Sequence, residues 1–88
     1  MRIDQLLWFL RLAKTRTLAQ AWVGEGHVRC NGRRVERMHH AISPGDVITL
    51  PLYGQVAVVE VLALPTRRGP PSEAQECYRR LDVPPGPS

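Results

Sequence analysis

The sequence has few of the features that are typical of disulfide-linked, secreted or membrane proteins. It contains only two cysteines, Cys30 and Cys77, which lie far apart and form no Cys-x-x-Cys pair. We therefore expect a reduced, cytoplasmic setting in which both are small apolar side chains, with a Cys30–Cys77 disulfide as the alternative. The first residues lack the basic region, apolar run and cleavage site of a signal peptide, and no stretch reaches the ~20 apolar residues of a membrane span.

Motifs of catalysis and cofactor binding are also missing. There is no Gly-x-Ser-x-Gly, P-loop or Rossmann glycine pattern, and the carboxylates are scattered rather than paired for acid–base work. His27 stands alone, and the adjacent His39 and His40 point apart in any extended chain, so four metal ligands do not assemble. The 88 residues suffice for one domain with a modest core. We expect no enzymatic activity, no metal and no cofactor.

What the sequence does have is arginine. The chain has twelve basic and eight acidic residues, which gives a net charge of +4, and eleven of the twelve basic residues are arginine. The planar guanidinium matches phosphate oxygens two at a time, which a lysine ammonium does not do. This balance favours a polyanion partner such as nucleic acid, or else a merely soluble basic surface. The positions of the arginines must decide between the two.

The N-terminal part predicts two helices. An apolar stripe at helical spacing, with Asp4 as its cap, predicts a helix from Asp4 to about Ala13. Thr15 is a second candidate cap, for a helix that stops near Gly24. The link of Lys14 and Thr15 is very short and predicts a sharp turn between the helices. The first stripe consists of Ile3, Leu6, Leu7 and Leu10.

The remainder predicts a small sheet, so the fold class is α+β. Asn-Gly at residues 31–32 indicates a tight hairpin, because both turn residues tolerate positive φ. A tight turn at 43–46 precedes a strand at 47–50, and a longer valine-rich strand follows at 55–64. Further on, Ser72 and Gln75 have capping-box spacing and predict a short third helix. Its apolar stripe would be Ala74, Cys77, Tyr78 and Leu81.

The hairpin gives the first candidate site. With a two-residue turn, Arg29 and Arg34 lie directly opposite each other, where like charges destabilise a strand pair. An anion between them would offset this repulsion. The alternative is a longer loop that breaks this register.

The start of the second helix gives another site. Its unpaired N–H groups and dipole attract anions. Arg11, Lys14 and Arg16 surround the Thr15 cap there, although every helix needs a cap. Arg67 and Arg68 form a third basic spot, which by itself is more often a solvated surface.

Four separated segments resemble a known family. Arg2-Ile3-Asp4, residues 11–16, Gly26 to Gly32 and Pro44-Gly45-Asp46 stand in the order of the RNA-binding domain named after ribosomal protein S4. The resemblance implies the alpha-L motif, in which two helices pack on a small, mostly antiparallel sheet. Within that group, residues 63–70 and 73–78 extend the likeness to the family of the fifteen-kilodalton ribosome-associated heat-shock protein.

This resemblance implies a partner and a set of contacts. Members of the heat-shock family bind the free large ribosomal subunit with a stalled peptidyl-tRNA, and short relatives act in ribosome quality control. We therefore expect a monomeric binder of structured ribosomal RNA, with transfer RNA as a second candidate. Arg11, Lys14, Thr15, Arg16, Arg29, Asn31 and Arg34 fall where the family touches RNA. Together with the other basic positions, the predicted RNA-binding set is Arg2, Arg11, Lys14, Thr15, Arg16, Arg29, Asn31, Arg33, Arg34, Arg67 and Arg68.

The sequence departs from the family in two places. Gln5 stands where a lysine is common, and the long basic C-terminal extension of the heat-shock protein has no counterpart. We expect one RNA-binding domain over residues 1–81 and a flexible, proline-rich tail at 82–88. The alternatives are a protein-interaction module for an acidic partner, an accessory subunit of a separate RNA-modification enzyme, and a relative with little RNA affinity.

Overall fold

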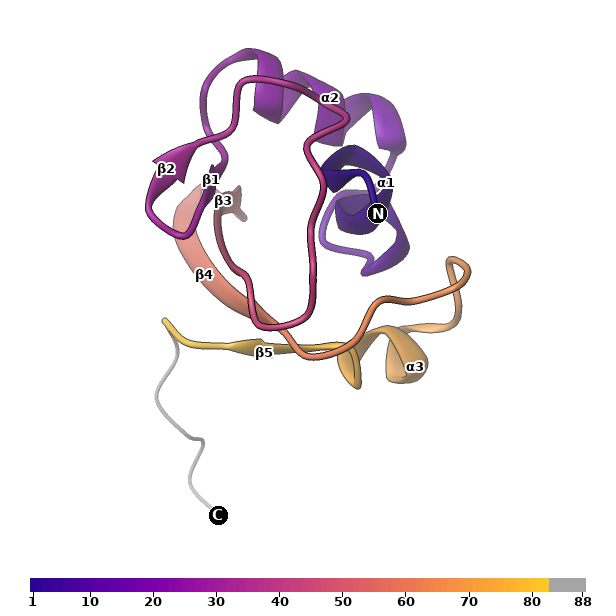
Figure 1. Cartoon of the computed structure of the whole chain (residues 1–88). Helices are drawn as coiled ribbons and strands as arrows, with labels where there is room; N and C mark the ends of the chain where they lie inside the picture. The colour runs from indigo at the N-terminus through magenta and orange to yellow at the C-terminus, as the bar shows by residue number, and fades with distance from the viewer. Residues whose placement is uncertain (83–88) are drawn as a thin grey trace.

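A computed structural model describes residues 1–82 and shows two helices packed on an antiparallel sheet (Figure 1). Helices α1 (Ile3–Phe9) and α2 (Arg16–Gly24) contact each other, and a short α3 (Pro71–Gln75) comes after the sheet's fourth strand. The five strands are ordered β2-β1-β3-β4-β5. Their bounds are Arg29–Cys30 for β1, Arg33–Arg34 for β2, Val47–Leu52 for β3, Gln55–Val61 for β4 and Tyr78–Arg80 for β5. The predicted α+β class and alpha-L arrangement are confirmed.

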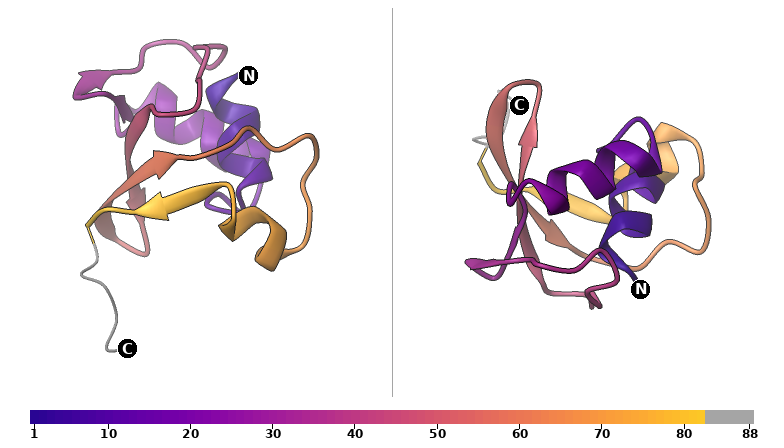
Figure 2. Two further views of the ribbon diagram at one scale, coloured as in Figure 1. Left: turned by 60° about the horizontal axis from the view of Figure 1, so that its bottom comes forward. Right: turned by 90° about the horizontal axis from the view of Figure 1, so that it is seen from above.

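The core lies between the helices and one face of the sheet (Figure 2). Burial alternates along β3, so that Ile48, Leu50 and Leu52 face the helices, as expected of a sheet with one solvated face. Leu6 and Leu7 of α1 meet them in a single apolar cluster. Residues 1–82 include no helix with the length and apolar character that crossing a bilayer requires.

The first helix is shorter than its apolar stripe predicts. It ends at Phe9, and Arg11 adopts a left-handed conformation with a φ of 61°. The N–H of Arg11 donates to the carbonyl of Trp8, and the N–H of Leu12 donates to that of Leu7, which together make a Schellman ending. The link between α1 and α2 therefore runs over residues 10–15, and the predicted two-residue link is wrong. Asp4 is likewise not the cap, because Arg2 occupies the N-cap position.

The two predicted turns of the central region are confirmed. Asn31 and Gly32 have φ values of 54° and 82°, as a two-residue hairpin turn requires, and Arg29 pairs with Arg34. In the second turn, Gly45 has a φ of 94° and the N–H of Asp46 donates to the carbonyl of Ser43 at 3.1 Å. The predicted strand at 47–50 continues to residue 52, whereas the one at 55–64 stops at 61.

The C-terminal prediction is partly wrong. The short helix exists, but Pro70 is its N-cap residue, without a side-chain hydrogen bond, and Ser72 caps nothing. The chain then turns into β5, where Tyr78 pairs with Val61 of β4, so this residue belongs to a strand rather than to a helical stripe. The backbone of β5 forms its hydrogen bonds with the edge of β4. A periodicity argument could not predict this, because β4 is distant in sequence. Of the predicted tail, Asp82 is bound by Arg80, and residues 83–88 lie outside the described part.

Both cysteines are free thiols. Cys30 is buried in the core and Cys77 packs against it, which confirms their expected role as apolar side chains. The alternative disulfide is not formed. Burial raises the pKa of both thiols above their usual value, so each is a poor nucleophile at neutral pH.

Candidate nucleic-acid interface

Asp4 organises the first group of cations. Its side chain has no exposed surface, yet it accepts hydrogen bonds from four residues. Arg2 donates twice at 3.1 Å, Arg16 donates from Nε at 3.3 Å, and Gln20 donates from Nε2 at 3.0 Å. The backbone N–H of Gln5 donates at 2.8 Å. Residues from α1 and α2 are thus held around one carboxylate, and sequence reasoning had given this residue only the role of a cap.

The carboxylate stays ionised. Burial pushes the pKa of Asp4 upward, but the hydrogen bonds from Gln20, the Gln5 backbone, Arg16 and Arg2 outweigh it and leave the pKa below its usual value. One negative charge therefore faces two guanidinium groups. The side chains of Arg2 and Arg16 remain 48% and 38% exposed, so both can still meet an anion in solvent.

The hairpin arginines share a face but avoid each other. Arg29 points its Nη1 toward the carbonyl of Gly32 at 3.4 Å, whereas the Arg34 guanidinium lies against Gly26, just beyond the end of α2. Carbonyls at a helix C-terminus carry partial negative charge, which favours a cation there. The register that we predicted is confirmed, but it does not by itself require an anion between the two side chains. Arg33 pairs with buried Cys30 and so belongs to the opposite face of the hairpin.

Gly26 should be hard to replace. Its φ is +80°, and a Cβ there would lie 2.5 Å from Nη2 of Arg34. We expect Gly26→Ala to lower the free energy of unfolding by about 1 kcal/mol or more, because alanine is strained at this φ and Arg34 must move. Chemical denaturation measures the loss. Gly26→Asn shares the added Cβ but tolerates positive φ, so a smaller loss in that variant separates backbone strain from the steric contact.

The loop after β2 connects the hairpin to the Asp4 group. The N–H of Ile3 donates to the carbonyl of His40 at 2.9 Å, and Arg2 forms an isolated bridge with Ala41. A shallow hollow of about 230 Å³ lies farther along the loop, toward the hairpin. It is lined by Arg34, Glu36, Arg37 and His40. Arg37 thus lies between the two groups, and sequence reasoning missed it although it follows the hairpin by three residues.

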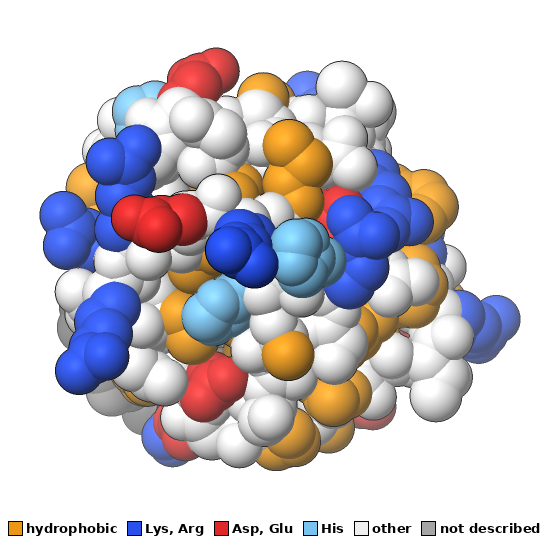
Figure 3. All heavy atoms as spheres, turned by 45° about the horizontal axis from the view of Figure 1, so that its top comes forward, with side chains coloured by type: hydrophobic (Ala, Val, Ile, Leu, Met, Phe, Trp, Pro, Cys, Tyr) orange, Lys and Arg blue, Asp and Glu red, His pale blue; other side chains and the backbone are white. Residues whose placement is uncertain are grey.

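We call this set the basic band and define it as Arg2, Arg16, Arg29, Arg34 and Arg37. Figure 3 shows one face of the molecule on which Lys and Arg side chains extend from one side to the other, with histidine side chains between them and carboxylates interspersed. The band draws on the start of α1, on α2 and on the hairpin with its following loop. These segments are linked in the fold, because Asp4 binds both Arg2 and Arg16 and the loop after β2 is hydrogen-bonded to Ile3.

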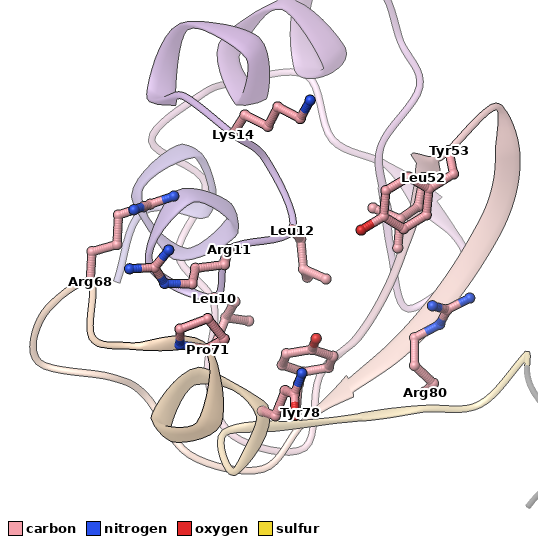
Figure 4. Close-up of a pocket in the computed structure, with 11 residues that line it drawn as sticks. Leu10, Arg11, Leu12, Lys14, Leu52, Tyr53, Arg68, Pro71, Tyr78 and Arg80 are labelled. Carbon is pink, nitrogen blue, oxygen red and sulfur yellow. The ribbon is translucent and has the colours of Figure 1, made fainter. Parts of the chain in front are cut away.

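The other predicted residues lie elsewhere. Arg11, Lys14 and Arg68 line a larger hollow of about 460 Å³ beside the α1–α2 link (Figure 4). The expected cluster around the start of α2 is thus divided, because Arg16 turns to Asp4 while Arg11 and Lys14 line that hollow. Arg67 forms an ion pair with Glu73 at 3.0 Å.

Two predicted contact residues already have structural partners. Thr15 is confirmed as the cap of α2, since its Oγ1 accepts from the N–H of Leu18 at 3.0 Å. Asn31 accepts from the N–H of Val47 at 2.9 Å and donates to Asp46 at 3.1 Å, which ties the hairpin turn to β3. Within residues 1–82, no three His, Cys, Asp or Glu side chains are grouped as a metal site.

Comparisons with known proteins decide the family. Residues 1–48 match the S4 domain. The fold matches the structure titled "Trimeric structure of Vibrio cholerae Heat Shock Protein 15" with a TM-score of 0.87 and 32% identity, over 93% of this chain and 82% of that one. The chain belongs to the S4-domain family, and within it to that of heat shock protein 15. The resemblance found in the sequence is confirmed.

Ribosomal proteins match half or more of this S4-domain protein. Small ribosomal subunit protein uS4 of Staphylococcus haemolyticus is 45% identical over 49 residues, which is 56% of this chain and 24% of that protein. The uS4 of Kosmotoga olearia is 30% identical over 84 residues, 96% of this chain and 35% of that protein. The chain spans about a quarter to a third of the length of these relatives.

The basic band and the larger hollow differ in how they relate to the S4 domain. Every residue of the band lies within the matched residues 1–48. The hollow also takes residues from β3, the β3–β4 turn, α3 and β5, which lie beyond that segment or cross its end. The hollow of this S4-domain protein is therefore built jointly by the matched domain and the segment on its C-terminal side.

Proposed function

We propose that this S4-domain protein binds structured ribosomal RNA through the basic band and catalyses no reaction. The observation that carries the proposal is how the band is held together. Arg2 and Arg16 share a single carboxylate, the loop after β2 is hydrogen-bonded to Ile3 beside them, and Arg34 and Arg37 line one hollow. Guanidinium groups suit RNA phosphates, and an A-form helix is recognised by shape and backbone because its major groove excludes side chains. The ribosomal names of the uS4 relatives support the choice of RNA.

The proposal extends to the target. By its likeness to heat shock protein 15, we assign the large ribosomal subunit, with a stalled peptidyl-tRNA complex as the state bound and ribosome quality control as the context. The domain of residues 1–81 would act there as a single unit. The uS4 relatives are small-subunit proteins, so both subunits belong in the test.

Salt dependence measures the proposed contacts. If the five band arginines neutralise about five phosphates, the logarithm of the binding constant should fall with the logarithm of salt concentration at a slope of roughly −3 to −5. Fluorescence anisotropy with a ribosomal RNA fragment gives this slope. Sedimentation with purified large and small subunits, with and without ribonuclease, identifies the target. A slope near zero would contradict the proposed phosphate contacts. Binding to a subunit that survives ribonuclease would favour an acidic protein partner instead.

The oligomeric state needs its own measurement. We expect a monomer, whereas the solved heat shock protein 15 of Vibrio cholerae is described as trimeric. Light scattering of the purified protein, alone and with RNA, reports the mass directly. A mass three times that of the chain would contradict the expected monomer.

A further inference from the structure

The larger hollow lies away from the basic band. Its walls are the α1–α2 link, the β3–β4 turn and the segment from α3 to β5 (Figure 4). In the right view of Figure 2, the β3–β4 turn projects on one side of α2, and the β1–β2 hairpin with its following loop lies on the other side. The hollow shares no lining residue with the one near the hairpin. Its volume of about 460 Å³ is in the ordinary range for a small ligand.

The charge of this hollow is positive. Arg11, Lys14, Arg68 and Arg80 line it, and its lining residues include no Asp or Glu. Arg11 and Arg68 donate from Nε to the carbonyls of Gly69 at 2.6 Å and Trp8 at 3.1 Å. These carbonyls fix the directions of the two side chains without neutralising their charge. Arg80 alone of the four forms an ion pair among residues 1–82, with Asp82.

Aromatic rings and an apolar floor complete the hollow. Tyr53 and Tyr78 contribute rings from different elements, and the buried Leu12 and Leu52 also line the hollow. Tyr53 is 90% exposed, so most of its apolar ring faces water. An unpaired nucleic-acid base can stack on an exposed aromatic ring of this kind.

The backbone at this hollow is strained. Arg11 and Tyr53 have φ values of 61° and 51°, and both line the hollow. Glycine or asparagine would adopt this conformation at lower cost. The strained conformation costs free energy at two positions whose side chains line one hollow. Arg11 closes the end of α1 and Tyr53 belongs to the two-residue β3–β4 turn, so the two turns set where these side chains leave the backbone.

We propose that this hollow binds one unpaired nucleotide of the RNA that the basic band holds, with the base on Tyr53 and its phosphate near Arg11 and Lys14. The inference rests on the proposed function and extends it to the class of RNA. A duplex is too wide for a hollow of this volume, whereas a single base with its phosphate matches both the ring and the charge. The preferred RNA is therefore a folded element with a single-stranded extension that passes to the other side of α2.

Three RNAs and two variants test this site. The RNAs are a blunt hairpin, the same hairpin with an overhang of about ten nucleotides, and one with an abasic overhang of that length. For the protein as it stands, we expect the overhang to increase affinity about 5- to 100-fold over the abasic overhang, which carries the same phosphates. Tyr53→Asn suits the left-handed turn but lacks the ring, and Tyr53→Trp retains an aromatic face. Tyr53→Asn should lose this increase and bind the blunt hairpin as before, whereas Tyr53→Trp should keep it.

The outcomes separate the two proposals. Failure to bind any of the RNAs overturns the proposed function, and the inference with it. Binding of the blunt hairpin without an increase from the bases of the overhang overturns the inference alone, as does an equal loss for all three RNAs in Tyr53→Asn. The last measurement is a binding titration with adenosine monophosphate. If this nucleotide without RNA binds as tightly as the overhang RNA, the ligand is a free nucleotide rather than a strand.

Discussion

Replacing Asp4 with alanine should lower the free energy of unfolding by about 2–3 kcal/mol, the largest effect expected of any single charged residue here. The substitution removes the acceptor of Arg2, Arg16, Gln20 and a backbone N–H at once. The loss is smaller than for a fully buried ion pair because the two arginines are partly exposed and can be rehydrated. Urea unfolding measures it. Glu36→Ala, at an exposed carboxylate that lines the hollow with Arg34 and Arg37, is the matched control and should change stability by less than about 0.5 kcal/mol.

The same carboxylate should make the fold sensitive to acid. The pKa of Asp4 is lower in the folded protein than its usual 3.8, so the unfolded chain binds the proton more readily. Its contribution to stability is therefore complete above the usual pKa and is lost as the pH falls through the lowered value. Asp4→Asn should lose less stability between neutral pH and pH 2 than the unmodified protein does. An equal acid loss in both would assign the sensitivity to another carboxylate, such as Asp82, whose pKa Arg80 also holds well below the usual value.

Substituting both hairpin arginines should weaken RNA binding without unfolding the domain. For Arg29→Gln with Arg34→Gln, we expect about 10- to 100-fold lower affinity and a salt slope reduced by about 2, because two phosphate contacts are lost. Stability should change by less than about 0.5 kcal/mol, since both side chains are exposed and their guanidinium groups already point apart.

Arg79→Gln is the control for this double substitution. Arg79 is an exposed arginine on β5 that pairs with Glu60, outside the basic band. Its removal should leave the affinity for a blunt RNA hairpin within about threefold and lower the salt slope by less than about 1. A double variant of Arg29 and Arg34 that unfolds yet binds RNA as before would show that these arginines serve the fold and that the band is misassigned.

The band and the hollow, taken together, suggest how one small domain could distinguish RNAs. The proposed phosphate contacts along the band would fix position but carry little sequence information. An unpaired base in the hollow would add a requirement for a strand end or a flexible loop. Selection would then depend on the junction between paired and unpaired RNA, a feature that a duplex alone does not offer.

Short-range features of the fold were predictable. The Asn31–Gly32 turn, the cap at Thr15 and the turn at 43–46 each depend on residues that are neighbours in sequence, and all three are confirmed. The hairpin register followed from the turn, because a two-residue loop leaves a single way to pair the strands. The family could also be recognised, since its motifs are local and keep their order.

The arrangement of the site was less predictable. Periodicity gave the first helix too many residues, because it cannot register the left-handed Arg11 that ends it. Tyr78 was assigned to a helix because its partner strand β4 is distant in sequence. Arg11 and Arg16 were placed together because they are close along the chain, yet they serve different surfaces.

The sequence by itself determined the family, the turns, the arginine-rich character and the register that sets Arg29 opposite Arg34. Only the tertiary structure decided that Asp4 is a buried hub, that Arg37 joins the band, and that Tyr53 stands over a separate cationic hollow. The reason is physical. A turn or cap is closed by neighbours a few bonds away, whereas the partners and exposure of a side chain depend on segments that meet only when the helices pack on the sheet.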